Sequence, residues 1–318
     1  MNDSLYTLTL TSPFAGRYSA NSDADDNESS NQPDATRYDY GTDILTYTTE
    51  PTERPTESTY GVELEFNPRG GRTNFVTSVD AVFAGCPHFF VKSDCSISVD
   101  GGEIVTTPRT LGAHNKMFGL IEEHAAGFRA ATTCGFHVHA LVPNNLFTTA
   151  RVYQFIASPA LSAFVTAIAK RPANSYCYRS NYAIGAPDAT RWASNRRADH
   201  SSAFTFSGKG TVEFRIFASH TKRYMLSSYV EFADALLTFC SARPISSDPS
   251  LALDGVVPVL GEFLKFVLDN STRYPNLAYR LNLPTMRAVI AATLRADAPF
   301  DNSLFRKQLT VTAPNGNM

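Results

Sequence analysis

The chain has 318 residues, of which 43% are hydrophobic and 18% charged, the balance of a globular protein with a substantial core. No apolar run approaches the roughly 20 residues of a membrane-spanning helix, and MNDSLYTLTL lacks the basic and apolar regions of a signal peptide. The net charge of −2 is uneven: residues 1–60 carry eleven acidic and three basic side chains, and the remainder carries nineteen and twenty-five. A mildly basic body of this kind suits an anionic ligand such as a nucleotide.

The cysteines and the basic residues indicate the cellular compartment and the class of partner that we expect. The five cysteines are an odd number without a CxxC pair, which predicts free thiols in a reducing compartment, and we expect a cytoplasmic location. The densest basic cluster, Arg191 to Arg197, is thinner than a nucleic-acid-binding surface requires. The sequence therefore gives no direct evidence for a nucleic-acid partner, we expect no membrane partner, and the oligomeric state stays open.

The first part of the chain differs in composition from the rest. Residues 21–43 are polar and acidic, with almost no aliphatic side chains to offset the entropy cost of ordering. We predict that residues 1–57 form an acidic, mostly disordered arm with a solubilising role. Residues 58–318 are then the folded domain.

Alternation of apolar and polar residues predicts strands in four places along this domain. YGVELEFNP (60–68) and CGFHVHALV (134–142) each read as one strand. Residues 89–108 read as two strands around the turn Asp100-Gly101, and residues 203–219 as a hairpin with its turn near Gly208 to Gly210. Strands in hairpins indicate an antiparallel sheet.

Helical spacing of apolar residues occurs in the intervening and following segments. The predicted helices cover residues 110–128, 146–170 with an interruption at Pro159, and a C-terminal series over residues 224–296. Because strands come in hairpins and helices follow in runs, the fold class is α+β with a mostly antiparallel sheet.

The polar residues of these strands share an unusual composition. Glu63 and Glu65 lie on one face of their strand, as do His137 and His139, and Glu213 and Arg215. In the hairpin with a two-residue turn, Ser98 would stand opposite Glu103, with Asp94 on the same side. One face of the sheet is thus expected to gather four carboxylates, two imidazoles and a guanidinium, with Asp94 as a further acidic candidate.

Two interpretations compete for this face. An antiparallel sheet normally exposes polar residues on its solvent side, so any single pair is weak support for a functional site. Taken together, however, crowded carboxylates repel one another unless cations neutralise them. Carboxylates with an imidazole and an arginine suit divalent cations that hold a polyphosphate, and the chain has neither a P-loop nor a GxGxxG motif to do so otherwise.

Four motifs, YGVELEF, SDCSI…GGEIVTTP, CGFHVHA and TVEFRIFASH, resemble in this order the amidoligase family of phages and bacteria. That family belongs to the carboxylate–amine ligases related to glutamine synthetase and glutamate–cysteine ligase. The resemblance covers roughly residues 60 to 240. It implies a glutamine-synthetase-like catalytic sheet, a curved half-barrel with helices on its outer face, which holds ATP and Mg²⁺ or Mn²⁺.

The resemblance also implies roles and a reaction. Glu63, His137 and Glu213 look like the cation ligands that bridge the ATP phosphates. The ligands nearer the substrate look like Glu65 and Glu103, with Asp94 a third whose shorter arm departs from the family pattern. His139 resembles a substrate-side histidine, and Arg215 resembles the arginine that steadies the transferred phosphoryl group. ATP would activate a small-molecule or peptide carboxylate to an acyl phosphate, which an amine attacks to form an amide.

Some questions stay open at this level. No motif assigns the arginines that bind nucleotide, and the candidates are Arg179, Arg191, Arg196 and Arg197. A zinc-dependent hydrolase built on His137, His139 and a carboxylate is an alternative, although zinc needs fewer carboxylates. A structural or partner-binding protein that keeps the fold without the activity is another, because a fold does not fix a function. The acid and the amine are not identified.

Overall fold

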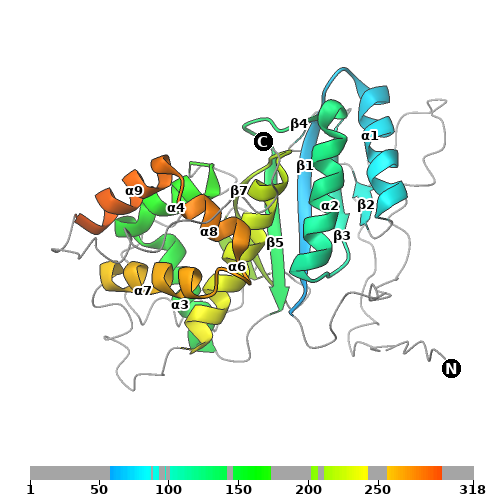
Figure 1. Cartoon of the computed structure of the whole chain (residues 1–318). Helices are drawn as coiled ribbons and strands as arrows, with labels where there is room; N and C mark the ends of the chain where they lie inside the picture. Colours follow the sequence, from blue (N-terminus) through cyan, green and yellow to red (C-terminus); the bar gives the residue numbers. More distant parts are fainter. Residues whose placement is uncertain are drawn as a thin grey trace, which may run out of the picture.

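The computed structural model describes residues 58–86, 89–92, 97, 101–141, 146–172, 202–206, 211–242 and 256–295. These residues form an α+β fold in which helices pack against an antiparallel sheet (Figure 1). This confirms the predicted fold class at that level. The predicted arm, residues 1–57, lies outside the described residues.

The sheet has seven strands, and every pairing among them is antiparallel. They are β1 (Tyr60–Pro68), β2 (Phe89–Lys92), β3 (Gly102–Thr106), β4 (Phe128–Arg129), β5 (Gly135–Leu141), β6 (Phe204–Phe206) and β7 (Thr211–Ala218). Their order is β2-β3-β1-β5-β7-β6, and β4 pairs with the end of β1. The described strands form an open sheet with β2 and β6 at its edges, and β1, β5 and β7 lie side by side at its centre.

Helices cover the apolar face of this sheet. On β1 the side chains of Val62, Leu64 and Phe66 are fully buried, as the alternation predicts. Phe136 of β5 packs against Phe118 and Tyr229, with ring centroids 5.8 and 5.6 Å apart. Aromatic burial of this kind is the main favourable term for such a core, and it leaves the other face of the strands to the polar residues.

The helices fall into two groups (Figure 1). α1 (Arg72–Gly85) and α2 (Leu111–Glu123) pack on each other beside β1 and β3, and α2 also contacts the long helix α6 (Arg223–Ala242). The second group is α3 (Leu146–Ala157), α4 (Ser162–Ala169), α7 (Val256–Asp269), α8 (Pro275–Leu281) and α9 (Pro284–Arg295). In this group α3, α7 and α8 contact α6, and α9 packs against α4. Two short 3-10 turns, η2 (Ala125–Gly127) and η3 (Pro159–Leu161), complete the described elements.

The predicted break at Pro159 is confirmed, because η3 separates α3 from α4 there. In the described part of the chain no single helix is long and apolar enough to cross a membrane; one bent pair, Thr148–Ala157 with Pro159–Ala169 at 60°, has the length and composition when the two are counted together.

The register of the β2–β3 pair corrects one prediction. Lys92, not Ser98, stands opposite Glu103, so the strands do not meet at a two-residue turn at Asp100-Gly101. This register sets Val91 opposite Ile104, and both are buried in the core. Burial of one strand face fixes register strongly, and here it outweighs the local turn signal.

A network of polar groups, buried except for Arg273, joins the start of β1 to the helices. The Tyr60 hydroxyl donates to Asp234 on α6, and Arg273 donates to the same carboxylate at 3.0 Å. Glu231, one turn earlier, accepts from the Leu277 amide and from the Asn276 side chain, both at 2.6 Å. The Leu277 amide belongs to the first turn of α8, where amides lack partners within the helix, so Glu231 caps α8.

Candidate functional site

The polar face of the three central strands brings the predicted residues together. Glu63 on β1 stands opposite His137 on β5, and His139 stands opposite Glu213 on β7. On the other side of β1, Glu65 stands opposite Glu103 on β3. Directly opposed residues on one face lie about 5 Å apart at their Cβ atoms, which is why side chains from four strands meet.

His137 lies at the centre of this cluster, almost completely buried. Its Nδ1 atom is 3.3 Å from Glu63 Oε2 and 3.4 Å from Glu213 Oε1. Its other nitrogen, Nε2, is 3.9 Å from Glu65 Oε1. One ring therefore faces carboxylates from two strands at one edge and a third carboxylate at the other.

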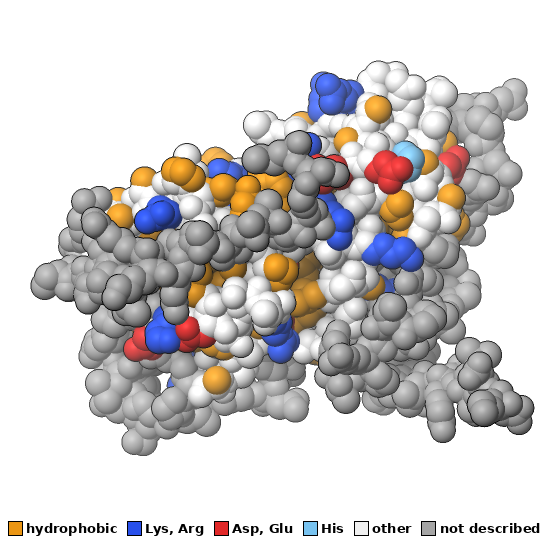
Figure 2. Space-filling view, in the orientation of Figure 1, with side chains coloured by type: hydrophobic (Ala, Val, Ile, Leu, Met, Phe, Trp, Pro, Cys, Tyr) orange, Lys and Arg blue, Asp and Glu red, His pale blue; other side chains and the backbone are white. Residues whose placement is uncertain are grey.

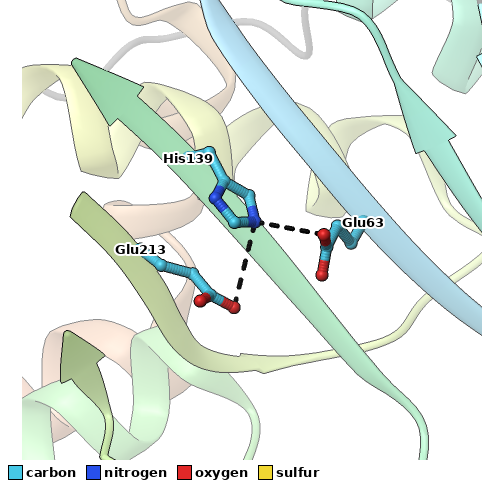
Figure 3. A group of neighbouring side chains, drawn as sticks. All are labelled: Glu63, His139 and Glu213. Atoms are coloured by element: carbon cyan, nitrogen blue, oxygen red, sulfur yellow. Dashed lines mark ion pairs between the residues drawn. The ribbon is translucent and has the colours of Figure 1, made fainter. Parts of the chain in front are cut away.

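His139 lies nearer the solvent than His137, with 18% of its side chain exposed. Its Nε2 atom is 3.4 Å from Glu63 Oε1 and 3.9 Å from Glu213 Oε1 (Figure 3). Its Nδ1 atom is 3.5 Å from the Thr211 hydroxyl, at the long limit of a hydrogen bond. When Nδ1 carries the proton and donates it to Thr211, the lone pair on Nε2 points at the two carboxylates, which is the arrangement of a metal ligand.

The remaining carboxylates are individually held. Glu65 is buried and accepts a 2.6 Å hydrogen bond from the Gly135 amide. Arg215 donates to Glu213 Oε1 at 2.6 Å, which places its guanidinium at the edge of the cluster. Glu103 is 1% exposed, the most buried of the four.

Two groups of three side chains can each surround a cation, and Glu63 belongs to both. One is Glu63, His139 and Glu213, and the other is Glu63, Glu103 and His137; in each the ligand atoms lie within 4.8 Å of one another. Octahedral Mg²⁺ with ligands at about 2.1 Å sets neighbouring ligand atoms about 3.0 Å apart and opposite ones about 4.2 Å apart. The distances from His139 Nε2 to Glu63 Oε1 and to Glu213 Oε1, 3.4 and 3.9 Å, lie between these two values.

The charge of the cluster supports the same chemistry. Four carboxylates, one of them paired with Arg215, gather in a largely buried volume, where divalent cations can offset the repulsion between them. Carboxylate oxygens with imidazole nitrogens are ligands for Mn²⁺ and Mg²⁺ and also accept Zn²⁺. The residues present therefore fit divalent cations.

Most of the predicted residues lie in this one cluster: Glu63, Glu65, Glu103, His137, His139, Glu213 and Arg215. Asp94 lies outside the described residues, as do the candidate nucleotide arginines Arg179, Arg191, Arg196 and Arg197. The two histidines are grouped differently from the expected sets. His139 forms a cation-sized group with Glu63 and Glu213, whereas His137 forms one with Glu63 and Glu103, although His137 also lies 3.4 Å from Glu213.

Sequence reasoning missed one buried residue of this region, Arg171. It follows α4, and one of its guanidinium nitrogens reaches the space beside Gly135 and His137. Arg171 stands in no motif and in no alternating segment, so the sequence carried no signal for it.

Two other potentially reactive side chains, those of His114 and Cys134, are buried outside the cluster. His114 is buried, contacts the Tyr60 carbonyl through Nε2 at 2.6 Å and stacks on Phe118; burial lowers its pKa to about 4. Cys134 is a buried free thiol whose pKa burial raises, which opposes a nucleophilic role. His88 and His200 lie outside the described residues.

Comparisons with known proteins do not assign a function to this chain. No protein-family model matches the sequence, and no curated protein does. Among solved structures, the chain is similar to the complex between prokaryotic ubiquitin-like protein Pup and its ligase PafA, with a TM-score of 0.34 and 9% sequence identity. That match covers 76% of this chain and 64% of the other. A TM-score this low does not establish a shared fold.

On the face shown in Figure 2, the visible charged side chains of the described residues do not gather into one large patch. Basic and acidic side chains of the described residues there are scattered in small groups among hydrophobic and uncharged ones. The buried cluster on the other face of the sheet is therefore the strongest candidate for chemistry.

Proposed function

We propose that this protein is an ATP-dependent carboxylate–amine ligase, which forms an amide through an acyl phosphate with Mg²⁺ or Mn²⁺ bound on the polar face of the sheet. The observation that carries the proposal is Glu63, shared by two cation-sized groups of side chains. Two cations held by one carboxylate are a means of gripping a polyphosphate from both sides. Of the sequence motifs that resemble amidoligases, YGVELEF, GGEIV, CGFHVHA and TVEFRIF lie on or at the ends of the strands that build this cluster.

Each side chain has a defined task in this proposal. Glu63, His139 and Glu213 would hold the cation that binds the ATP phosphates, and Glu63, Glu103 and His137 would hold the second cation, with Glu65 beside His137. When bound, the cations neutralise charge on the phosphoryl group being transferred. His139 is the more exposed of the two histidines, so the cation that it would hold lies on the side open to substrate.

Arg215 adds a fixed positive charge at the edge of the cluster. Its ion pair with Glu213 at 2.6 Å orients the guanidinium without binding all of its donors, because Nη1 alone makes that contact. The remaining donors can hold phosphoryl oxygens in a fork. Positioning and electrostatics of this kind need no nucleophilic side chain.

The decisive experiment measures ADP release from ATP with Mg²⁺ or Mn²⁺ across a panel of amino acids, short peptides and amines. The wild type should release ADP only when an acid and an amine are both present. Glu63→Gln removes the carboxylate common to both groups and should lower the rate at least about 100-fold, as loss of a principal charged contact does. Glu123→Gln, an exposed glutamate at the end of α2, is the matched control and should behave as the wild type.

Equal rates in Glu63→Gln and the wild type would refute the proposed site. Tightly bound stoichiometric zinc in purified protein, with no ATP binding, would favour the zinc hydrolase instead. Failure to bind either ATP with Mn²⁺ or zinc would favour a protein without catalytic activity.

A further inference from the structure

Arg171 is brought to the cluster by the way α4 ends. The helix stops at Ala169, and Lys170 adopts a left-handed conformation with φ of 55°, which reverses the chain direction. Arg171 follows directly and is 4% exposed. A long, charged side chain is thus directed inward immediately after a helix end, where arginines are ordinarily solvated.

Gly135, at the start of β5, marks where this side chain arrives. A Cβ atom placed on Gly135 would lie 2.7 Å from Arg171 Nη1 and 2.8 Å from His137 Nε2, so a larger residue there would displace one of these two side chains. The amide of the same glycine donates to Glu65. The side chains of Arg171, His137 and Glu65 therefore lie close together beside Gly135, at the start of β5 on the polar face of the sheet.

This corner lies across the His137 ring from Arg215. The Nδ1 edge of the ring faces Glu63 and Glu213, where Arg215 is bound, and the Nε2 edge faces Glu65 and Arg171. Two guanidinium groups thus flank the carboxylates from two sides. A phosphoryl group bound in the cluster would therefore have an arginine side chain on each side, Arg215 on one and Arg171 on the other.

The end of α4 is anchored by a second buried arginine, Arg280 on α8. It donates to the carbonyls of Ala167 and Ile168 in the last turn of α4, and to the Ser228 hydroxyl at 3.0 Å. Its guanidinium also lies over the Tyr229 ring, 5.0 Å from the centroid. These contacts hold the helix end that carries Arg171 against α6, so the position of Arg171 is set by the core.

We propose that Arg171 is a phosphate-binding residue, which holds the oxygens of the transferred phosphoryl group on the Glu65 side of the cluster. The inference rests on the proposed function. Arginine binds phosphate through paired donors. The guanidinium of Arg171 lies beside Glu65 and His137, so it would place a positive charge next to the phosphate oxygens on that side of the cluster. Arg171 also donates to the Thr133 carbonyl at 3.5 Å, the long limit of a hydrogen bond.

The test compares Arg171→Gln and Arg171→Lys with the wild type by calorimetry. Mn²⁺ binding is measured alone, and then ATP and adenosine binding are measured at saturating Mn²⁺. Arg171→Gln should weaken ATP binding by about 10- to 100-fold, the range for one lost charge-assisted hydrogen bond. Arg171→Lys should recover part of this loss, because it restores the charge without the fork. Adenosine binding and Mn²⁺ binding should stay within about twofold of the wild type, and Arg129→Gln, an exposed arginine on β4, should change nothing.

Each other outcome overturns a defined part of the reasoning. Wild-type affinity for ATP in Arg171→Gln, with wild-type thermal stability, would refute the role of Arg171 and leave the ligase proposal standing. Equal losses for Mn²⁺, adenosine and ATP would show a structural residue. No binding of ATP to the wild type with Mn²⁺ would refute the proposed function, and this inference with it.

Discussion

Replacing Glu231 by glutamine should change how the stability of the protein depends on pH. Glu231 is 4% exposed, and burial raises its pKa from 4.5 to about 7 despite hydrogen bonds from the first turn of α8. A carboxyl group with a raised pKa in the folded state favours folding when protonated. Its contribution is therefore present below pH 4.5 and is lost as the pH rises towards 7.

The size of this effect follows from the two pKa values. A rise from 4.5 to about 7 corresponds to about 3 kcal/mol between the ends of that pH range. His114 acts in the opposite direction over nearly the same range, because burial lowers its pKa from 6.5 to about 4. The two groups offset each other in the wild type, so the wild-type curve alone conceals both.

The difference between variant and wild type isolates Glu231. Urea unfolding of Glu231→Gln and wild type at pH 5 and pH 8 gives the free energy of unfolding of each. The variant should gain about 2 to 3 kcal/mol relative to the wild type between these pH values, since glutamine does not ionise. Glu123→Gln, at an exposed position, should stay parallel to the wild type. A Glu231→Gln curve parallel to the wild type would show that the carboxyl titrates in the folded protein as it does in the unfolded chain.

Two further changes test other parts of the structure. His114→Gln keeps a donor for the Tyr60 carbonyl but does not titrate, so the variant should lose up to about 3 kcal/mol less stability than the wild type between pH 6.5 and pH 4 in the same urea assay; equal losses would contradict the burial of a neutral imidazole. Lys170→Gly removes the cost of a left-handed lysine and should raise the free energy of unfolding by about 0.5 to 1 kcal/mol in thermal unfolding, whereas Lys170→Ala should not.

The strand pattern predicted the composition of the site because a strand has a fixed period of two. Glu63, His137 and Glu213 each alternate with apolar residues, so their faces followed without knowledge of the strand order. The order itself, with β1, β5 and β7 adjacent, is a tertiary property. Alternation placed the residues on one side of a sheet, and only the registers showed that Glu63 meets His137 while His139 meets Glu213.

The elements that the sequence missed have weak local signals. α1 is rich in β-branched residues, and Gly71 at its start makes no side-chain capping bond. α8 has seven residues, and a side chain distant in sequence, Glu231, caps it. Arg171 owes its place to a helix end, a reversed backbone and a glycine on another strand. These are long-range causes, which no window of sequence contains.

An irregularity in β7 connects the register to the chemistry. Phe136 pairs with Phe217 and Val138 with Phe214, so a β-bulge lies opposite His137. The extra residue lets Phe217 rather than Ile216 stand opposite Phe136, where it stacks on Tyr229 in the core. It also falls beside Arg215 and opposite His137, which lies at the centre of the cluster. Bulges bend a strand and re-aim its side chains, and this one lets β7 keep its aromatic contact with the core while Glu213 and Arg215 stay on the polar face. The packing of one face and the chemistry of the other are therefore set by the same local feature.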